Sequence, residues 1–248
     1  MDFRDRIHPE RAVAGFSKLD GTVRFYNFVK AALVRIDARK VLDLGAGRGG
    51  PLLRNTGWRR ELLDLRQLGA EVWAADVDPV VTSHPASDHQ IVLDPSGPLP
   101  FPDEFFDVIV SDWTFEHVAE PEKLAAELLR ILRPGGFICA RTANRHGYVK
   151  LAASVVPNRL HRKALESIQP SRKHEDVFPT VYRMNSVRVL RRLFPGCEIA
   201  WYRDNSEPAY VFDNPLLYRL FLALHWVLPG SMATCLQVFI RKPSGVGE

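Results

Sequence analysis

One decapeptide tells most about this chain: Val41-Leu42-Asp43-Leu44-Gly45-Ala46-Gly47-Arg48-Gly49-Gly50. Its apolar first half carries an acid near the end, and its second half is rich in glycine. Because glycine has no Cβ and tolerates positive φ, Gly45, Gly47 and Gly49 let the backbone turn sharply and approach a ligand closely. A strand followed by such a loop and a helix is typical of nucleotide recognition.

A second carboxylate narrows the choice of ligand. The apolar run Glu71–Asp76 also ends in an acid. The Asp76 carboxylate can accept hydrogen bonds from both hydroxyls of a ribose. The glycine loop and this acid together predict a cofactor that contains adenosine.

The spacing of these features favours S-adenosylmethionine over NAD. Gly45, Gly47 and Gly50 also fit the dinucleotide pattern G-x-G-x-x-G, in which the ribose acid follows the loop by about 20 residues. Here Asp76 lies 33 positions after Asp43. A carboxylate at Asp43, beside a helix N-terminus, also suits an ammonium or sulfonium group better than a diphosphate, which it would repel.

Further motifs follow the loop in a fixed order. Together with Val41–Gly49 they are Val72–Asp78, Leu99–Asp103, Phe105–Asp112, Glu116–Val118 and Leu129–Gly136. Over residues 41–142 the chain resembles the core of the class I S-adenosylmethionine-dependent methyltransferases, most closely the methyltransferase type 11 group. The resemblance implies a Rossmann-like, seven-stranded, mostly parallel sheet with an antiparallel last strand. Two departures are a longer stretch over residues 51–70 and an extra residue between Asp94 and Leu99.

The resemblance also implies roles on the cofactor side. It implies that Asp43 orders the glycine loop and faces the ammonium of the cofactor, and that Asp94 contacts the adenine amino group. The alternatives are a turn-capping role for Asp43, a turn before Pro95 for Asp94, and a purely structural role for Asp112. The predicted cofactor-binding residues are Asp43, Gly45, Ala46, Gly47, Gly49, Asp76, Val77, Asp94 and Asp112.

Candidates for the substrate side follow the fourth and fifth strands. His117 is a candidate general base or substrate contact, because imidazole titrates near physiological pH. The alternative is a hydrogen-bonded histidine that supports the loop. His146 is the second catalytic candidate, and no metal-ligand spacing is present, so no metal is predicted. The resemblance implies a substrate contact at Trp113, and placement after the fifth strand predicts further contacts from Arg141, Asn144 and Arg145.

Strands and helices are expected to alternate, which predicts an α/β fold with a doubly wound parallel sheet. Ligands then bind at the carboxyl ends of the strands. We expect a single domain over 1–248, with a cofactor-binding core at about 38–142, a substrate-side insertion at about 143–193, and C-terminal strands with an apolar helix at about 194–242. The expected strands are 40–44, 71–76, 90–93, 106–111, 137–141, 198–203 and 235–241; the expected helices are 25–36, 57–68, one from Pro121 to a stop at Pro134–Gly136, and 215–228.

Composition agrees with a globular protein. The chain has 248 residues, of which 46% are hydrophobic and 25% charged, and a net charge of +4. No dense basic stripe appears, which argues against nucleic acid as a partner. The three cysteines lie far apart, and the first residues lack the apolar core of a secretory signal. We therefore expect free thiols and a cytoplasmic location.

Two segments leave further partners open. The basic residues of the insertion form either a solvated face or a site for an anionic substrate. The apolar helix 215–228 is shorter than the ~20 residues that span a membrane. It suits a core or lid position, but also a lipid-like substrate or interfacial docking. The basic residues and histidines are Arg145, His146, Arg159, His161, Arg162, Lys163, Arg172, Lys173 and His174.

The sequence predicts methyl transfer from S-adenosylmethionine to a small-molecule, glycan-related or lipid-linked acceptor. An Asn-Pro-Pro-Tyr motif is absent from the sequence, which argues against amino groups of nucleic acid or protein as acceptors. Three alternatives stay open: an NAD(P)-dependent oxidoreductase, a catalytically silent S-adenosylmethionine-binding module, and a protein that binds lipid surfaces.

Overall fold

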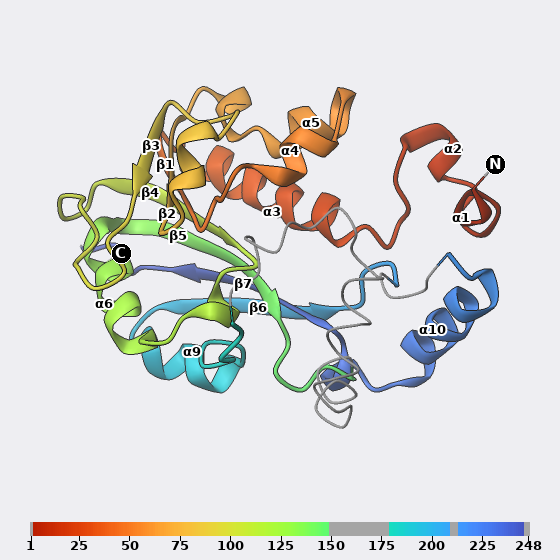
Figure 1. Ribbon diagram of the computed structural model, residues 1–248. Helices are drawn as coiled ribbons and strands as arrows, with labels where there is room; N and C mark the ends of the chain where they lie inside the picture. The colour runs from red at the N-terminus through yellow and green to blue at the C-terminus, as the bar shows by residue number, and fades with distance from the viewer. Residues whose placement is uncertain (1, 149–178, 209–212, 246–248) are drawn as a thin grey trace. The chain divides into compact units, whose positions relative to one another are not determined.

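The computed structural model describes residues 2–148, 179–208 and 213–245 (Figure 1). Their strands form one seven-stranded sheet in the order β3-β2-β1-β4-β5-β7-β6. The predicted mostly parallel, Rossmann-like sheet with an antiparallel end is confirmed. The strands are β1 (Lys40–Leu44), β2 (Glu71–Asp76), β3 (His89–Val92), β4 (Phe106–Asp112), β5 (Leu132–Ala143), β6 (Glu198–Asp204) and β7 (Cys235–Arg241).

The first four strands bring their carboxyl ends to one edge of the sheet. β1 pairs in parallel with β2 and with β4, so that Asp43 lies opposite both Ala74 and Val110. β4 is buried almost throughout, which is why its sequence is a nearly continuous apolar run. Asp43 near the end of β1 and the acids that end β2 and β4 therefore lie at the same edge.

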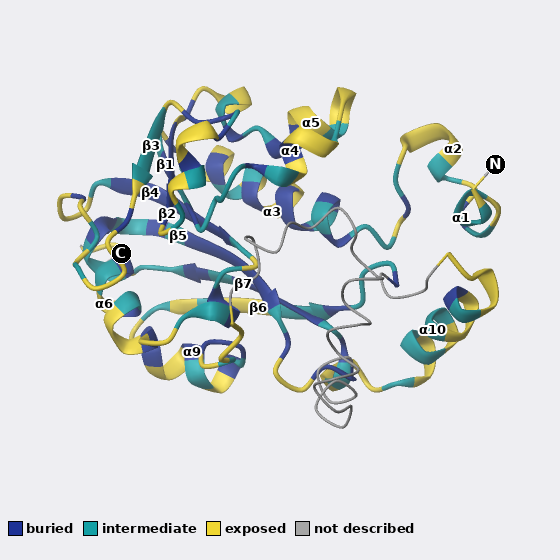
Figure 2. Cartoon of the chain, viewed as in Figure 1, coloured by how far each residue is buried: buried dark blue, intermediate teal, exposed yellow. Residues whose placement is uncertain are grey.

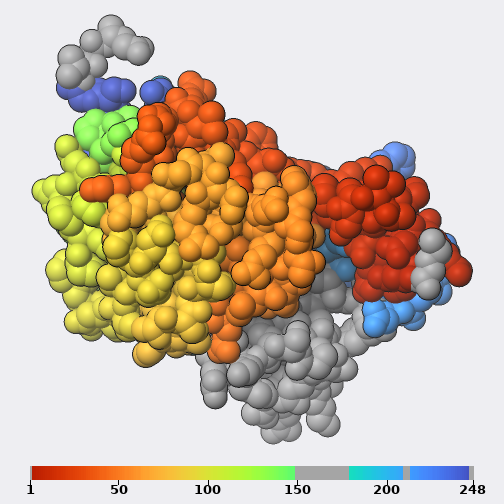
Figure 3. Space-filling view, turned by 90° about the horizontal axis from the view of Figure 1, so that it is seen from above, coloured from red at the N-terminus to blue at the C-terminus, as the bar shows by residue number. Residues whose placement is uncertain are grey.

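Helices cover both faces of this sheet. Figure 1 shows α3, α4 and α5 on one face, and α6 and α9 on the other. In Figure 3 the orange and yellow atoms, which belong to about residues 40–100, form one continuous surface. The described helices are α1 (Phe3–Ile7), α2 (Arg11–Ala14), α3 (Gly21–Arg35), α4 (Gly50–Arg54), α5 (Gly57–Leu63), α6 (Pro121–Ile131), α9 (Val187–Leu193) and α10 (Pro215–Val227), with short 3-10 turns at Leu65–Leu68, Pro79–Ser83, Phe115–His117 and Gly230–Met232.

The core is made by the central strands and the helix faces that pack on them. Figure 2 shows buried residues in dark blue along these strands. Phe25 of α3, Phe106 of β4 and Leu128 and Ile131 of α6 are all fully buried. The buried face of α6 is formed by Pro121, Ala125, Leu128 and Ile131.

The chain divides into two compact units. Unit 1 comprises Met1–Thr22, Ala143–Pro179 and Arg203–Leu236; unit 2 comprises Val23–Thr142, Thr180–Tyr202 and Gln237–Glu248. The predicted cofactor-binding core lies entirely in unit 2. The last part of the predicted insertion, with α9, also belongs to unit 2. Unit 1 holds α1, α2 and α10.

The helix predicted over 57–68 is wrong in its second half. α5 ends at Leu63, and Asp64 follows it in an extended conformation. The Asp64 carboxylate accepts a hydrogen bond from the Arg66 backbone N–H at 3.1 Å, which starts a separate 3-10 turn. Apolar spacing alone does not reveal this break, because the break comes from an aspartate that competes for backbone donors.

The helix that begins at Pro121 was expected to end at Pro134–Gly136, but it ends before these residues. α6 ends at Ile131, and β5 begins at the next residue and runs through Gly136. A Cβ on Gly136 would lie 2.6 Å from the Asp107 carbonyl oxygen. The glycine therefore permits a close approach of β5 to β4, at the point where the register between the two strands shifts.

Candidate functional site

The glycine loop leaves β1 and is fixed to the end of β2. Gly45, Gly47 and Gly49 have φ of 75°, 51° and 68°, so all three occupy the left-handed region. The Gly45 N–H donates to the Ala75 carbonyl at 2.8 Å. The Gly47 N–H donates to Asp76 Oδ2 at 2.8 Å. The loop and the predicted ribose acid are thus one hydrogen-bonded assembly within unit 2.

The three loop glycines are required for different reasons. A Cβ on Gly45 would lie 2.1 Å from Thr114 Oγ1, and one on Gly49 would lie 2.6 Å from Pro85 Cδ. A Cβ on Gly47 would meet only Asp76 Oδ2, at 3.9 Å. Gly45 and Gly49 are therefore packed against the protein, whereas Gly47 faces open space beside Asp76.

Three carboxylates gather at this edge of the sheet. Asp43 is the last residue but one of β1, Asp76 ends β2 and Asp112 ends β4. Burial, and then the nearby charges of Asp112 and Asp76, raise the pKa of Asp43 to about 7. The ionised form of Asp43 is therefore disfavoured without a nearby positive charge, and a cation bound there would favour its carboxylate.

The Asp76 carboxylate can accept further hydrogen bonds from a ligand. Its Oδ1 accepts a hydrogen bond from the Asp78 N–H at 2.9 Å, and its Oδ2 accepts the bond from Gly47. Each carboxylate oxygen has two lone pairs, so both can accept a further hydrogen bond. Val77, the next residue, is 42% exposed and offers an apolar surface beside them.

Two residues near Asp43 were not predicted from the sequence. His84 is buried, and its Nε2 lies 3.9 Å from Asp43 Oδ2. The Ala86 N–H points at His84 Nδ1 at 3.4 Å, which favours the tautomer with the proton on Nε2, facing Asp43. Burial lowers the pKa of His84, so its ring is neutral at physiological pH. No motif in the sequence marks this histidine.

Tyr26 of α3 is the second residue that the sequence did not reveal. It is buried, and burial followed by the charges of Asp112 and Asp43 raises the pKa of its phenol. The phenol therefore stays protonated near two of the three carboxylates. In the sequence Tyr26 is one more apolar position in a helical pattern, so only the fold connects it with the acids.

Asp94 follows β3 and is exposed. Its Oδ1 accepts a hydrogen bond from the Ser96 N–H at 2.8 Å, and its carbonyl accepts one from Gly97 at 3.2 Å. This is the turn that the sequence left as the alternative to an adenine contact. The predicted cofactor role of Asp94 stays a prediction.

Asp112 and Arg141 form a buried ion pair. Arg141 Nε and Nη2 donate to Asp112 Oδ1 and Oδ2 at 2.6 and 2.7 Å. The Arg141 side chain is only 4% exposed. Such a two-point pair fixes the guanidinium. Arg141 thereby holds the carboxyl end of β5 against that of β4, and its predicted contact with a substrate stays a prediction.

Trp113 stands out at the end of β4. Its φ is 60°, which is rare for a residue with a side chain, and its side chain is 41% exposed. The Trp113 N–H donates to the Arg141 carbonyl at 2.8 Å, and the Arg141 guanidinium lies 5.3 Å from the indole centre. Residues that are held in such a strained backbone conformation are concentrated at functional sites. Trp113 is well placed for the predicted substrate contact.

A buried polar network supports the loop that carries His117. Glu116 is 5% exposed, and burial raises the pKa of its carboxyl. Its Oε2 accepts a hydrogen bond from Thr142 Oγ1 at 2.7 Å, and Thr142 Oγ1 in turn accepts one from Asn185 Nδ2 at 2.5 Å. His117 itself is partly exposed, and its N–H donates to the Thr114 carbonyl at 2.9 Å.

The other predicted residues belong to unit 1. Asn144 is 1% exposed, and its amide donates to the carbonyls of Ser231 and Ala233 at 2.9 and 2.7 Å. These bonds give Asn144 a structural role. Arg145 and His146 are exposed. The structure therefore places these three candidates and the glycine loop in different units.

Most basic residues of the predicted insertion lie outside the described residues: Arg159, His161, Arg162, Lys163, Arg172, Lys173 and His174. Among the residues that are described, no group of three or more His, Cys, Asp or Glu side chains could hold a metal ion.

The described residues fit an adenosyl cofactor that carries positive charge. The open space beside Gly47 accepts a ligand at the loop, and Asp76 has free acceptor positions for ribose hydroxyls. The raised pKa of Asp43 indicates a place for a cationic group, which a diphosphate could not take.

Comparison with known proteins agrees with this assignment. Residues 42–140 match the family model described as a methyltransferase domain. The matched segment includes the glycine loop and the carboxylates at Asp43, Asp76 and Asp112.

Two curated relatives illustrate the similarity. A demethylmenaquinone methyltransferase of Clavibacter sepedonicus is 33% identical over 113 residues, which cover 43% of this chain and 42% of that protein. A ubiquinone biosynthesis O-methyltransferase of Caulobacter vibrioides is 28% identical over 142 residues, which cover 55% and 49%. The chain spans about half, or less, of the length of the curated relatives it matches.

The solved structure of the cyclase SpnF has a similar fold. It matches with a TM-score of 0.53 and 19% identity, covering 90% of this chain and 82% of that one. At this identity the likeness concerns the fold alone, because one fold can host different reactions.

Proposed function

We propose, on the premise that residues 42–140 form the core of a class I S-adenosylmethionine-dependent methyltransferase, that the whole protein transfers a methyl group to a small-molecule, glycan-related or lipid-linked acceptor. One observation carries the proposal. Asp43 is partly buried on β1, between the strands that end in Asp76 and Asp112, and its pKa rises to about 7. A bound cation would favour the ionised acid, and S-adenosylmethionine has two cationic groups, a sulfonium and an ammonium.

The chain's own residues would bind and orient the reactants. Asp76 would accept hydrogen bonds from the ribose, and the Gly47 backbone would lie against the cofactor. When bound, S-adenosylmethionine supplies an electrophilic methyl group for in-line displacement. Trp113 would position the acceptor, and much of the rate can come from holding the nucleophile at about 3–3.5 Å from that methyl. His117 would take the proton of a hydroxyl acceptor.

An apolar, lipid-linked acceptor is the form of the proposal that we favour. The relatives from Clavibacter and Caulobacter are named for quinone substrates or pathways. An exposed tryptophan beside the cofactor edge also suits an apolar acceptor better than a charged one.

Equilibrium binding separates this proposal from an NAD(P)-dependent oxidoreductase. We expect S-adenosylmethionine to bind in isothermal titration, and NADH to bind much more weakly or not at all. Asp76→Asn should weaken cofactor binding by about 1–3 kcal/mol, the scale of a charge-assisted hydrogen bond. Asp78→Asn is the matched control, because Asp78 caps the following turn through the Val80 N–H. Tighter binding of NADH than of S-adenosylmethionine would favour the oxidoreductase.

Turnover separates the enzyme from a silent binding module. The protein is incubated with methyl-labelled S-adenosylmethionine and fractionated cell extract, including an organic-solvent fraction. Label in a lipid fraction supports the acceptor class that we favour. Cofactor binding without label in any fraction would instead support a binding module.

A further inference from the structure

Helix α10 turns its apolar residues outward. Leu216, Leu220, Trp226 and Val227 are 76%, 63%, 92% and 76% exposed. Positions 216, 220, 223 and 227 are spaced by four, three and four residues, so they lie along one face of the helix. The outer face of α10 is thus a continuous apolar stripe, bordered by Trp226.

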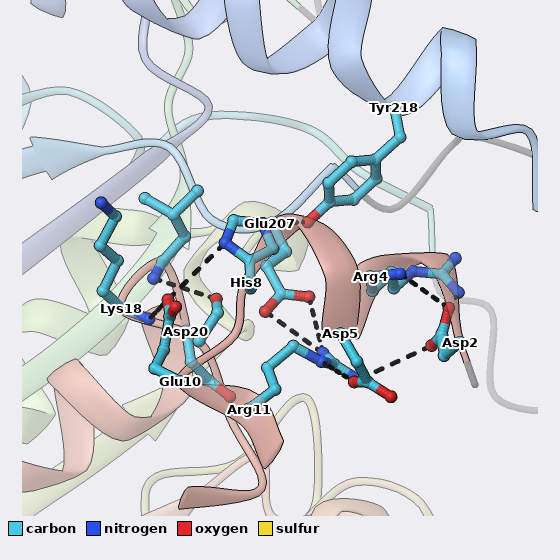
Figure 4. Close-up of polar contacts among 12 residues, drawn as sticks. Asp2, Arg4, Asp5, His8, Glu10, Arg11, Lys18, Asp20, Glu207 and Tyr218 are labelled. Carbon is cyan, nitrogen blue, oxygen red and sulfur yellow. Dashed lines mark hydrogen bonds and ion pairs between the residues drawn. The ribbon is translucent and has the colours of Figure 1, made fainter. Parts of the chain in front are cut away.

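The opposite face of the helix contacts the rest of unit 1 through two pairs of tyrosine and histidine side chains. Tyr218 is fully buried, and its hydroxyl lies 2.8 Å from His8 Nε2 (Figure 4). About two turns further on, His225 Nε2 lies 2.5 Å from the hydroxyl of Tyr148. A helix that packs on its own unit through such groups, and leaves Leu216 and Leu220 exposed, is suited to contact with a second apolar surface.

The formal charge within residues 214–228 is positive. Residues 214–228 contain no acid, and Arg219 is exposed on α10. Asp213, just before the helix, is paired with Arg4 at 3.0 Å. Tryptophan and arginine beside an apolar stripe are typical of helices that lie in the headgroup region of a bilayer. No helix among the described residues is long and apolar enough to cross a membrane.

We propose that α10 docks on the surface of an anionic lipid bilayer, with its stripe inserted between the headgroups and Arg219 in contact with lipid phosphate. The inference concerns unit 1 and does not depend on cofactor binding. It is compatible with a lipid-linked acceptor, because docking would bring the protein to the membrane that holds such a compound.

Vesicle sedimentation tests the proposal. The full chain is mixed with phosphatidylcholine vesicles that contain phosphatidylglycerol, and is expected to sediment with them. Leu216→Ser combined with Leu220→Ser should weaken binding by about tenfold or more, because two apolar side chains no longer leave water. Arg219→Gln should weaken binding to these vesicles several-fold, but leave any binding to pure phosphatidylcholine unchanged.

A matched pair of tryptophan variants controls for exposed apolar surface in general. Trp226→Ser is expected to lose vesicle binding, whereas Trp58→Ser, which alters a 50% exposed tryptophan of α5, is expected to keep it. The circular dichroism spectrum and thermal unfolding of each variant are compared with those of the native protein, and unchanged values show that it is folded. Failure of the cofactor to bind the native protein would affect the proposed function and leave this test intact.

Three results would overturn the proposal. The native protein fails to sediment with anionic vesicles, or Trp58→Ser weakens binding as much as Trp226→Ser. The third such result is that Leu216→Ser with Leu220→Ser, or Trp226→Ser, converts a dimer into a monomer in analytical ultracentrifugation and leaves vesicle binding unchanged. The stripe would then be the contact for a second copy of this chain.

Discussion

At the scale of single residues, Asp43 couples cofactor binding to pH. Its pKa of about 7 means that the acid is largely protonated below that pH without a ligand. A bound cation favours the carboxylate, so binding should release a proton. We expect the ionisation of Asp43 to make affinity for S-adenosylmethionine rise from about pH 5 to pH 7. Above that range Asp43 should cause no further change in affinity. Isothermal titration in buffers of different ionisation enthalpy measures the released proton.

Asp43→Asn provides the control, and the stability of the protein provides a second measurement. The variant should bind more weakly and release no proton from this position. In the native protein the pKa is raised from 3.8 to about 7. The folded state therefore binds more protons than the unfolded state between these values, and its stability should fall as pH rises through this window. The variant should lack that loss, and an equal pH profile for both proteins would contradict the assignment.

The loop glycines allow a sharper substitution test than removal of a charge. Alanine at Gly45 or Gly47 would adopt a left-handed conformation, at a cost of about 1–2 kcal/mol. Only Gly45→Ala also brings Cβ to 2.1 Å from Thr114 Oγ1. We therefore expect Gly45→Ala to lose more stability in chemical denaturation, and Gly47→Ala to stay folded but bind the cofactor poorly.

A double variant checks the cause of the difference. Thr114→Ala removes the hydroxyl that a Cβ at Gly45 would meet, and should restore part of the stability lost in Gly45→Ala. It should give no such rescue to Gly47→Ala. Full cofactor affinity in Gly47→Ala would mean that the open space beside this residue is not where the cofactor lies.

The site residues that the sequence predicted lie on expected strands, whereas those that it did not predict are brought to the site by the fold. Asp43 lies near the end of one apolar run and Asp76 ends another, so their place at the sheet edge follows from the strand pattern. His84, just after a 3-10 turn, lies 3.9 Å from Asp43, and the charge of Asp43 raises the pKa of Tyr26 on the helix before the first strand. Local pattern does not record such long-range contacts, so these residues appear only when the chain is folded.

At the scale of elements, strand boundaries were predictable where burial alone sets them. β1, β2 and β7 begin and end where the sequence predicts, because each is a short apolar run bounded by polar residues. Boundaries failed where a single side chain or a tertiary contact decides. Asp64 divides the expected helix over 57–68, and Gly136 lies within β5 because the Asp107 carbonyl approaches it.

The anchoring of α10 yields a prediction at the same scale. Tyr218→Phe removes the hydroxyl that contacts His8, and leaves the buried imidazole without this partner. We expect a loss of about 1–3 kcal/mol in stability, together with faster hydrogen exchange in α1 and α10. Tyr202→Phe removes the hydrogen bond to Gln237 in unit 2, and serves as the control. Equal exchange in α1 for both variants would show that the Tyr218 contact does not hold this segment.

At the scale of the whole molecule, the two units divide the predicted functions. The cofactor-side residues belong to unit 2, whereas α10, Arg145 and His146 belong to unit 1. The sequence predicted a single domain with an insertion, since a change of pattern after β5 is visible along the chain. It did not predict that the first 22 residues would cluster with α10, because that grouping depends on contacts between distant segments such as His8 and Tyr218.

Binding of S-adenosylmethionine should therefore stabilise unit 2, at the glycine loop and the end of β2. A ligand that binds only the folded state raises its stability by about 2.7 kcal/mol at a concentration of 100 times Kd. We expect S-adenosylmethionine to raise the midpoint of thermal unfolding and to slow hydrogen exchange at residues 43–49 and 76–78, while NADH at equal concentration does neither. Asp76→Asn should require more S-adenosylmethionine for the same shift. Protection elsewhere in unit 2, with none at these two segments, would place the cofactor away from the glycine loop.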